Sequence, residues 1–90
     1  MKYHIFIENK VEKETRKIPR SDIQKIDKTI FALQKNPRPQ GCLKLTDKNG
    51  YRVRVGNYRI LYKINDKLKT VIIYKVKRKS ENTYKWNNFT

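Results

Sequence analysis

Three arginines stand close together in one short stretch and could jointly bind an anion. The stretch reads GYRVRVGNYRILYKI from Gly50 to Ile64, and its arginines are Arg52, Arg54 and Arg59. Alternating basic and apolar residues are typical of a half-buried strand, whose side chains point to opposite faces in turn. A guanidinium presents its N–H donors in a planar fork that matches phosphate. The pattern therefore predicts an anion-binding surface on one face of a sheet.

The turn between the two halves of this stretch predicts how the arginines face one another. Gly56 and Asn57 form a two-residue connection that requires positive φ, and its length fixes the register of the hairpin. With this loop Arg54 lies opposite Arg59, at a Cβ separation of about 5 Å, where like charges destabilise a sheet. An anion between the two guanidiniums would remove that repulsion. The apolar residues then share the core face: Val53, Val55, Tyr58, Ile60 and Tyr62.

A third strand, expected over residues 70–77, extends the basic surface. Running antiparallel to the strand at 58–64, it returns its C-terminal end to the neighbourhood of Arg59 and leads into Arg78, with Tyr84 six residues later. Basic groups beside an aromatic ring suit single-stranded RNA, with charge for phosphate and a ring for an unstacked base. Such residues can also be ordinary solvated surface. The lysines that we expect to bind the RNA backbone are Lys44, Lys75, Lys77 and Lys79.

Composition restricts the class of protein. The chain has 90 residues, with 23 Lys and Arg against eight Asp and Glu, giving a formal net charge of +15. Such a field attracts polyanions, nucleic acid before membrane surfaces. The single cysteine, Cys42, excludes an internal disulfide, and no carboxylate–histidine cluster suggests a metal or cofactor. With no apolar run suited to a signal peptide or membrane span, we expect one cytoplasmic domain over residues 1–90.

The remaining pattern predicts the elements that position this surface. Residues 3–7 suit a strand, residues 8–18 a short amphipathic helix that ends before Pro19, and residues 38–50 a loop or irregular edge. Ser21 and Gln24 form a capping box for a second helix, which runs to Asn36. A short C-terminal helix is expected over residues 80–86. The order is β-α-α-β-β-β: an α+β fold with a mainly antiparallel four-stranded sheet packed on a helical hairpin.

Over nearly its whole length the chain resembles the RelE-like toxins of bacterial and archaeal type II toxin–antitoxin pairs. The resemblance rests on YRVRVGNYRILYKI, on VKRKSENTY and on the two helices before them. It implies the RelE-like fold and a metal-independent endoribonuclease, an mRNA interferase. Such an enzyme cleaves mRNA in the ribosomal A site, the 2′-OH attacking the scissile phosphate, and thereby inhibits translation. It also implies a RelB-like acidic antitoxin that holds the toxin inactive in a hetero-oligomer.

The same resemblance implies roles for five residues. Arg52 and Arg54 fall where the best-studied branch has two catalytic lysines. Arg59 and Arg78 match its phosphate-binding arginines, and Tyr84 matches its base-stacking tyrosine. Arginine effectively cannot lose its proton, so Arg52 and Arg54 are assigned to charge stabilisation of the pentavalent phosphorane.

Two questions stay open at the level of sequence. The group that accepts the 2′-OH proton could be Lys44, Lys77, Glu81, or a group of the ribosome or substrate. The function could also differ: a ParE-like inhibitor of DNA gyrase would bind protein without nuclease chemistry. Alternatively, a catalytically inactive basic domain would only bind RNA or DNA.

Overall fold

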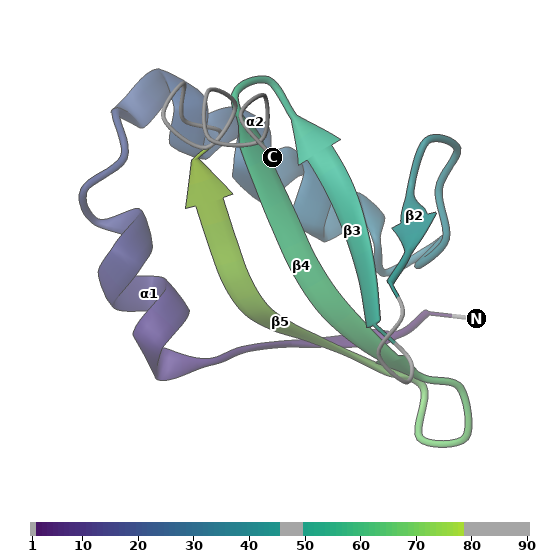
Figure 1. The fold of residues 1–90 in the computed structure, drawn as a ribbon. Coiled ribbons are helices and arrows are strands. Elements are labelled where there is room, and N and C mark those ends of the chain that lie inside the picture. The colour runs from purple at the N-terminus through teal and green to yellow at the C-terminus, as the bar shows by residue number, and fades with distance from the viewer. Residues whose placement is uncertain (1, 46–49, 79–90) are drawn as a thin grey trace, which may run out of the picture.

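The computed structural model describes residues 2–45 and 50–78 (Figure 1). Its elements are β1 (His4–Ile7), α1 (Asn9–Thr15), α2 (Arg20–Ala32), β2 (Leu43–Lys44), β3 (Gly50–Val55), β4 (Tyr58–Asn65) and β5 (Thr70–Arg78). The predicted α+β class and the order of its first six elements are confirmed, with the short strand β2 added. The helix expected over residues 80–86 lies outside the described residues.

One mixed sheet holds these strands in the spatial order β1-β5-β4-β3-β2. The pairings from β5 to β2 are antiparallel, whereas β1 runs parallel to β5. The sheet is therefore mainly antiparallel, as predicted, but it has five strands rather than four. The additional strand is two residues long. A segment of that length is too short to show the period-two alternation by which a strand is recognised in sequence.

The hairpin of β3 and β4 has the predicted register. Arg54 is paired with Arg59, Val53 with Ile60 and Val55 with Tyr58. Gly56 has a φ of 56°, the left-handed conformation that such a turn requires and that glycine adopts without steric cost. The apolar partners are buried on one face of the sheet, so the arginines necessarily occupy the other face.

A β-bulge divides β5 and changes which of its side chains face the core. Tyr62 is paired with Ile73, but the preceding residue, Leu61, is paired with Lys75, so that Tyr74 is the extra residue. Strict alternation from Ile73 would have turned Lys75 and every second residue after it toward the core. The bulge instead buries Val76 and leaves Lys75 on the opposite face.

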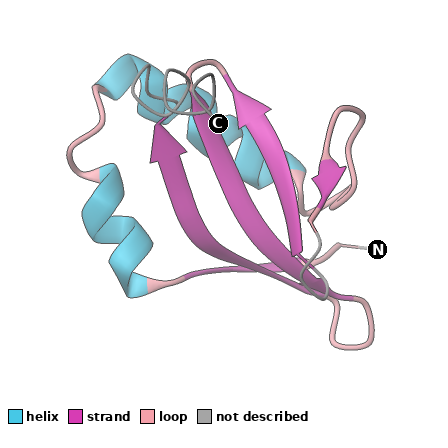
Figure 2. Cartoon of the chain, in the orientation of Figure 1, coloured by secondary structure: helices cyan, strands magenta, loops and turns pink. Residues whose placement is uncertain are grey.

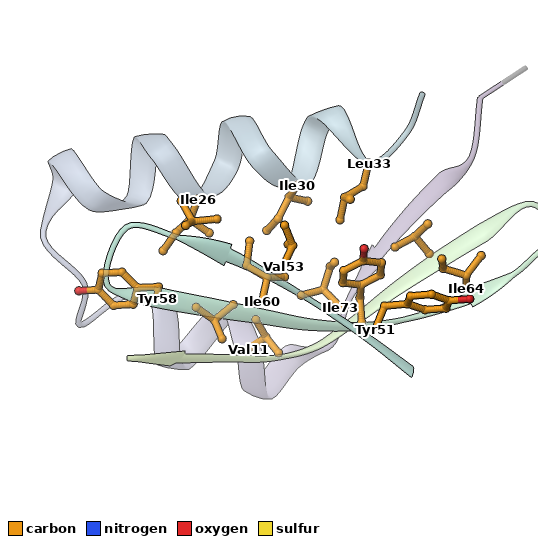
Figure 3. Packing of buried hydrophobic residues seen from close by; sticks show 14 residues of the cluster. Val11, Ile26, Ile30, Leu33, Tyr51, Val53, Tyr58, Ile60, Ile64 and Ile73 are labelled. Carbon is orange, nitrogen blue, oxygen red and sulfur yellow. The ribbon is translucent and has the colours of Figure 1, made fainter. Parts of the chain in front are cut away.

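Helix α2 covers the apolar face of the sheet and supplies much of the core (Figure 3). Ile26, Ile30 and Leu33 recur at helical spacing and are 7% exposed or less. In Figure 3 they point toward Val53 and Ile60. Burying each such side chain contributes about 1.5–3 kcal/mol. The complete buried cluster is Val11, Ile26, Ile30, Leu33, Tyr51, Val53, Val55, Tyr58, Ile60, Tyr62, Ile64, Val71, Ile73 and Val76.

Helix α1 flanks the part of β5 that lies beyond the end of β1 (Figure 2). Its fully buried residue, Val11, belongs to the same core. The helix spans Asn9–Thr15, shorter than the predicted 8–18. The Thr15 hydroxyl donates to the carbonyl oxygen of Glu12 at 2.8 Å. Pro19 then disfavours helical geometry at the residue before it.

No helix in the described ranges is long and apolar enough to cross a membrane.

The predicted capping box at the start of α2 is wrong. The helix begins at Arg20 with Pro19 as its N-cap residue, and no side chain caps it. Ser21 therefore lies inside the first turn rather than before it. The Pro19 carbonyl accepts hydrogen bonds from the N–H groups of Asp22 and Ile23, both at 3.0 Å. Proline is tolerated there because the residue lies before the helix, where a backbone N–H would have no intrahelical acceptor. The helix ends at Ala32, before the predicted Asn36.

A polar network ties the loop after α2 to the end of the sheet farthest from the hairpin turn. The Arg38 guanidinium forms an ion pair with Asp66, with Nη2 2.9 Å from Oδ2, and its Nε donates to the Tyr51 hydroxyl at 3.1 Å. The Tyr3 hydroxyl donates to Asp66 at 2.6 Å. The Arg38 hydrogen bond, followed by that from Tyr3, lowers the pKa of Asp66 to about 2. One exposed carboxylate thus joins three separate segments.

A second tyrosine extends this network into the core. Tyr62 is fully buried and stacks on Tyr51 with ring centroids 5.9 Å apart. Its hydroxyl donates to the carbonyl oxygen of Pro37 at 2.8 Å. Burial raises the pKa of Tyr62, because the charged form would lose its hydration. The loop at residues 36–38 is therefore held from both its exposed and its buried side.

Replacing Asp66 with Asn should make stability less sensitive to acid. A lowered carboxyl pKa means that the ionised group stabilises the fold above the ordinary value of 3.8 and that this contribution is lost as pH falls toward about 2. The parent's Tm should therefore fall more steeply over that range than the Tm of Asp66→Asn. The control is Asp27→Asn, on an exposed position of α2, which should keep the parent's dependence. Parallel Tm profiles for the parent and Asp66→Asn would contradict the assignment.

Candidate nucleic-acid interface

Three cationic side chains form a row across the outer face of the sheet, the face opposite α2. Arg54 on β3 is paired with Arg59 on β4, which is paired in turn with Lys77 on β5. Directly opposed side chains share a face and lie about 5 Å apart at Cβ. Three neighbouring strands therefore each present one positive charge at the same level. We call Arg54, Arg59 and Lys77 the cationic row.

The central arginine of the cationic row is the most constrained. Arg59 is half-buried, whereas Arg54 and Lys77 are exposed. Its Nε atom is buried and has no hydrogen-bond partner among the described residues. Leaving a buried donor unpaired costs about 1–3 kcal/mol. An oxyanion bound in the row would relieve the repulsion between neighbouring cations, and it would become the partner of Nε once the guanidinium turned to expose that atom.

The strands offer this row no negative charge. Neither β3, β4 nor β5 contains Asp or Glu. The two ion pairs found in the described part of the chain are Arg38–Asp66 at the opposite end of the sheet and Lys10–Glu8 next to α1. Within the same residues no group of three or more His, Cys, Asp or Glu could hold a metal ion. The row is thus suited to an external anion.

A second row continues the surface toward the centre of the sheet. Arg52 is paired with Leu61, and Leu61 with Lys75. Leu43, which is 52% exposed, is paired with Arg52 at the edge. Cations here alternate with apolar side chains, so the surface becomes less polar away from the hairpin turn. A ligand that has both phosphate and apolar groups matches this gradient.

The structure brings together only some of the residues that the sequence nominated. Arg52, Arg54, Arg59, Lys75 and Lys77 share the outer face. Two others do not: Arg78 is paired with Tyr58, and Lys44 with Tyr51, which places both on the side of the core tyrosines. Arg78 is exposed at the end of β5, next to the cationic row but turned from it by one position. Lys79, Glu81 and Tyr84 lie outside the described residues.

One residue of this face was missed in the sequence. Tyr74, the extra residue of the bulge, is half-buried, and the Lys63 Nζ lies 5.5 Å from the centroid of its ring. Lys63 faces outward because it alternates with the buried Tyr62 and Ile64. Tyr74 is therefore on the outer face as well. Period-two alternation gave no sign of it, because a bulge is the interruption of that period.

A family model and a curated relative both match almost the whole of this chain. A family model described as the ParE toxin of type II toxin–antitoxin systems, parDE, matches residues 5–83. RelE1 of Methanocaldococcus jannaschii is 32% identical over 89 residues, which cover 94% of this chain and 98% of that protein. Both similarities extend over the hairpin and β5, and so include every residue of the cationic row.

Solved structures share the fold. A chain of the archaeal RelE–RelB complex from Pyrococcus horikoshii OT3 has a TM-score of 0.81 and 28% identity, with coverage of 89% of this chain and 98% of that one. A mutant of the E. coli toxin RelE in the free state has a TM-score of 0.75 and 21% identity, with coverage of 94% and 93%. The second likeness shows the fold alone.

Replacing Arg54 with Thr should stabilise the protein. The change removes the like-charge pair with Arg59, which should raise the free energy of unfolding by about 0.2–1 kcal/mol at low salt. Arg52→Thr is a matched control, because it introduces the same side chain on the same strand and face, but opposite Leu61. The difference between the two variants should shrink in 1 M salt, where charges are screened within about 3 Å. Urea unfolding at both salt concentrations measures it. Equal effects of the two substitutions at low salt would show that the pair is not strained.

Proposed function

The chain belongs to the ParE toxin family of type II toxin–antitoxin systems, and we propose from this premise that it acts as a RelE-type endoribonuclease. Its substrate is mRNA on the ribosome, in the cytoplasm, and cleavage inhibits translation. The observation that carries the proposal is the cationic row, which has a buried, unpaired arginine donor at its centre and no carboxylate on its strands. A phosphodiester fits such a site in charge and in hydrogen-bonding geometry.

In the proposed reaction the ribose 2′-oxygen attacks the adjacent phosphorus while the bond to the 5′-oxygen breaks. The 2′-hydroxyl gives its proton to a base, the leaving oxygen takes one up, and a 2′,3′-cyclic phosphate remains. Negative charge accumulates on the non-bridging oxygens in between. Arg54 and Arg59, held at fixed positions by the hairpin, neutralise that charge. Arg52, one row away, holds the RNA backbone.

The proton acceptor among the described residues is best sought at Lys77. Arginine cannot serve, because it does not lose its proton at accessible pH. Lys44 shares the side of Tyr51 and faces away from the row. Lys77, in contrast, is directly opposite Arg59, within the reach of a phosphate bound there. Tyr84 keeps the base-stacking role that the resemblance to RelE-like toxins implies. Arg78, which lies on the side of Tyr58, would bind a phosphate only at the exposed end of β5, outside the cationic row.

The antitoxin forms the second part of the proposal. A structurally similar chain with 28% identity was solved in a complex of RelE with RelB. We infer a RelB-like acidic partner for this chain too, in a toxin–antitoxin hetero-oligomer. A net charge of +15 favours rapid capture of an acidic segment. A partner that covers the cationic row would exclude RNA from it.

Arg59→Ala should abolish most cleavage while leaving the fold intact. Removal of one preorganised donor for developing charge typically costs about 2.7–4 kcal/mol, or roughly a hundred- to a thousandfold in rate. The measurement is in vitro translation with primer extension to map mRNA ends at the ribosomal A site. Lys28→Ala, which removes one exposed charge from α2 on the opposite side of the sheet, should cleave like the parent.

Three other outcomes contradict the proposal. Parent-like cleavage by Arg59→Ala would remove the cationic row from the mechanism. If the parent produces no cuts but inhibits DNA gyrase in a supercoiling assay, the ParE-like alternative is correct. If it binds RNA and neither cleaves it nor inhibits gyrase, the chain is an inactive binding domain.

The antitoxin should protect cells, and it should associate with the toxin faster at low salt. Expression of the toxin alone should arrest growth, and co-expression of the small acidic protein encoded beside it should restore growth. The association rate of the pair, measured by stopped-flow fluorescence, should fall steeply with ionic strength, because the attraction is screened. Growth without inhibition when the toxin is produced alone at high level would contradict the assignment as a toxin.

A further inference from the structure

The bulge in β5 places an aromatic ring beside the cationic row. Tyr74 is the extra residue between Ile73 and Lys75, and its ring lies on the outer face together with Lys63. Without the bulge, the residues that follow would exchange faces. The interruption therefore places a half-buried tyrosine and an exposed lysine on the side of the sheet that carries the arginines. Bulges are over-represented next to active sites, where they re-aim side chains.

The spacing suits a nucleotide that neighbours the bound phosphate. Lys75, adjacent to Tyr74, is two residues from Lys77 on the same face. Two residues of a strand span about 7 Å. A phosphate in the cationic row would therefore have Tyr74 within the reach of the sugar and base attached to it. The Lys63 ammonium lies over the same ring, 5.5 Å from its centroid, so a stacked base would displace it, and the freed ammonium could contact the next phosphate.

We propose that the Tyr74 ring is a stacking surface for one base of single-stranded RNA, next to the phosphate held by the cationic row. The inference rests on the proposed function and adds a binding residue to it. Every base has a π-face, so a tyrosine binds it largely independently of sequence. Neighbouring cations hold the backbone while the ring holds the base, the combination typical of single-strand recognition.

The surface has a rival occupant, since an aromatic ring can also bind an apolar side chain of a protein partner. Two observations favour RNA. Lys63 lies over the ring and Lys75 follows Tyr74 in the chain, while Arg52 lies two strands away in the same row as Lys75, so positive charge is present next to the ring and across the face. These strands contain no carboxylate to neutralise it. A nucleotide carries both an aromatic base and a negatively charged phosphate, and so satisfies both requirements.

A thermodynamic cycle tests the contact between ring and base. The probes are short single-stranded RNAs with a 2′-deoxy group at the target nucleotide, which blocks cleavage, and with one abasic nucleotide moved along the sequence. Binding of the parent and of Tyr74→Leu is measured by fluorescence anisotropy at fixed salt. Loss of the ring should weaken binding roughly 5- to 150-fold. When the abasic nucleotide occupies the position that faces Tyr74, parent and variant should bind the probe equally well, because the probe has no base to stack on the ring.

Three controls separate stacking from charge and folding. Tyr74→Phe keeps the ring and should bind like the parent. Phe6→Leu changes another exposed aromatic residue, near the β1 edge and paired with Ile72, and should show no coupling to any abasic position. The salt dependence of binding should stay unchanged in Tyr74→Leu, since no charge is removed, whereas Lys77→Gln should reduce its slope by about one.

The outcomes distinguish this inference from the proposed function. If the parent binds RNA and Tyr74→Leu binds it equally, the stacking role is wrong while the nuclease proposal stands. If the variant loses affinity for the acidic antitoxin but not for RNA, the ring is a protein contact. If the parent fails to bind single-stranded RNA and fails to cleave mRNA on ribosomes, both are wrong.

Discussion

The repulsion between Arg54 and Arg59 is the constraint around which the other features are arranged. A two-residue turn fixes these cations opposite each other, and the apolar residues that alternate with them are buried under α2. Slipping the register of one strand by one residue would relieve the repulsion, but it would also turn the buried side chains of that strand toward solvent. The core therefore holds the cations together, and hydrophobic burial supplies the free energy that their proximity costs.

The two faces of the sheet differ in whether their polar and charged groups have partners within the chain. On the core side, Tyr62 donates to Pro37 and Arg38 is neutralised by Asp66. On the outer side, the strands carry cations without carboxylates, and the buried Nε of Arg59 has no partner in the described ranges. At the end of the sheet that contains Asp66, the charge of Arg38 is thus neutralised within the chain. Near the hairpin turn, the described strands supply no carboxylate to the cationic row.

Much of this arrangement follows from the sequence, and the exceptions have physical causes. Gly56 and Asn57 specify the register, so the pairing of Arg54 with Arg59 was predicted correctly. Alternation failed in β5, because the bulge at Tyr74 breaks the period on which it depends. Ser21 was misread as a cap, since local polarity suggests a helix start that Pro19 in fact provides. The expectations for Tyr84 and for the roles of the arginines stay predictions.

The parallel pairing of β1 with β5 has a consequence for biosynthesis. His4 is aligned with Thr70 and Arg59 with Lys77, so the first strand and the cationic row both await the same late segment of the chain. Contacts this distant in sequence form slowly, because closing a long loop costs entropy before any contact repays it. During synthesis, the nascent chain can form the β3–β4 hairpin but not the complete row. The order of translation therefore delays the cationic row until β5 has been made.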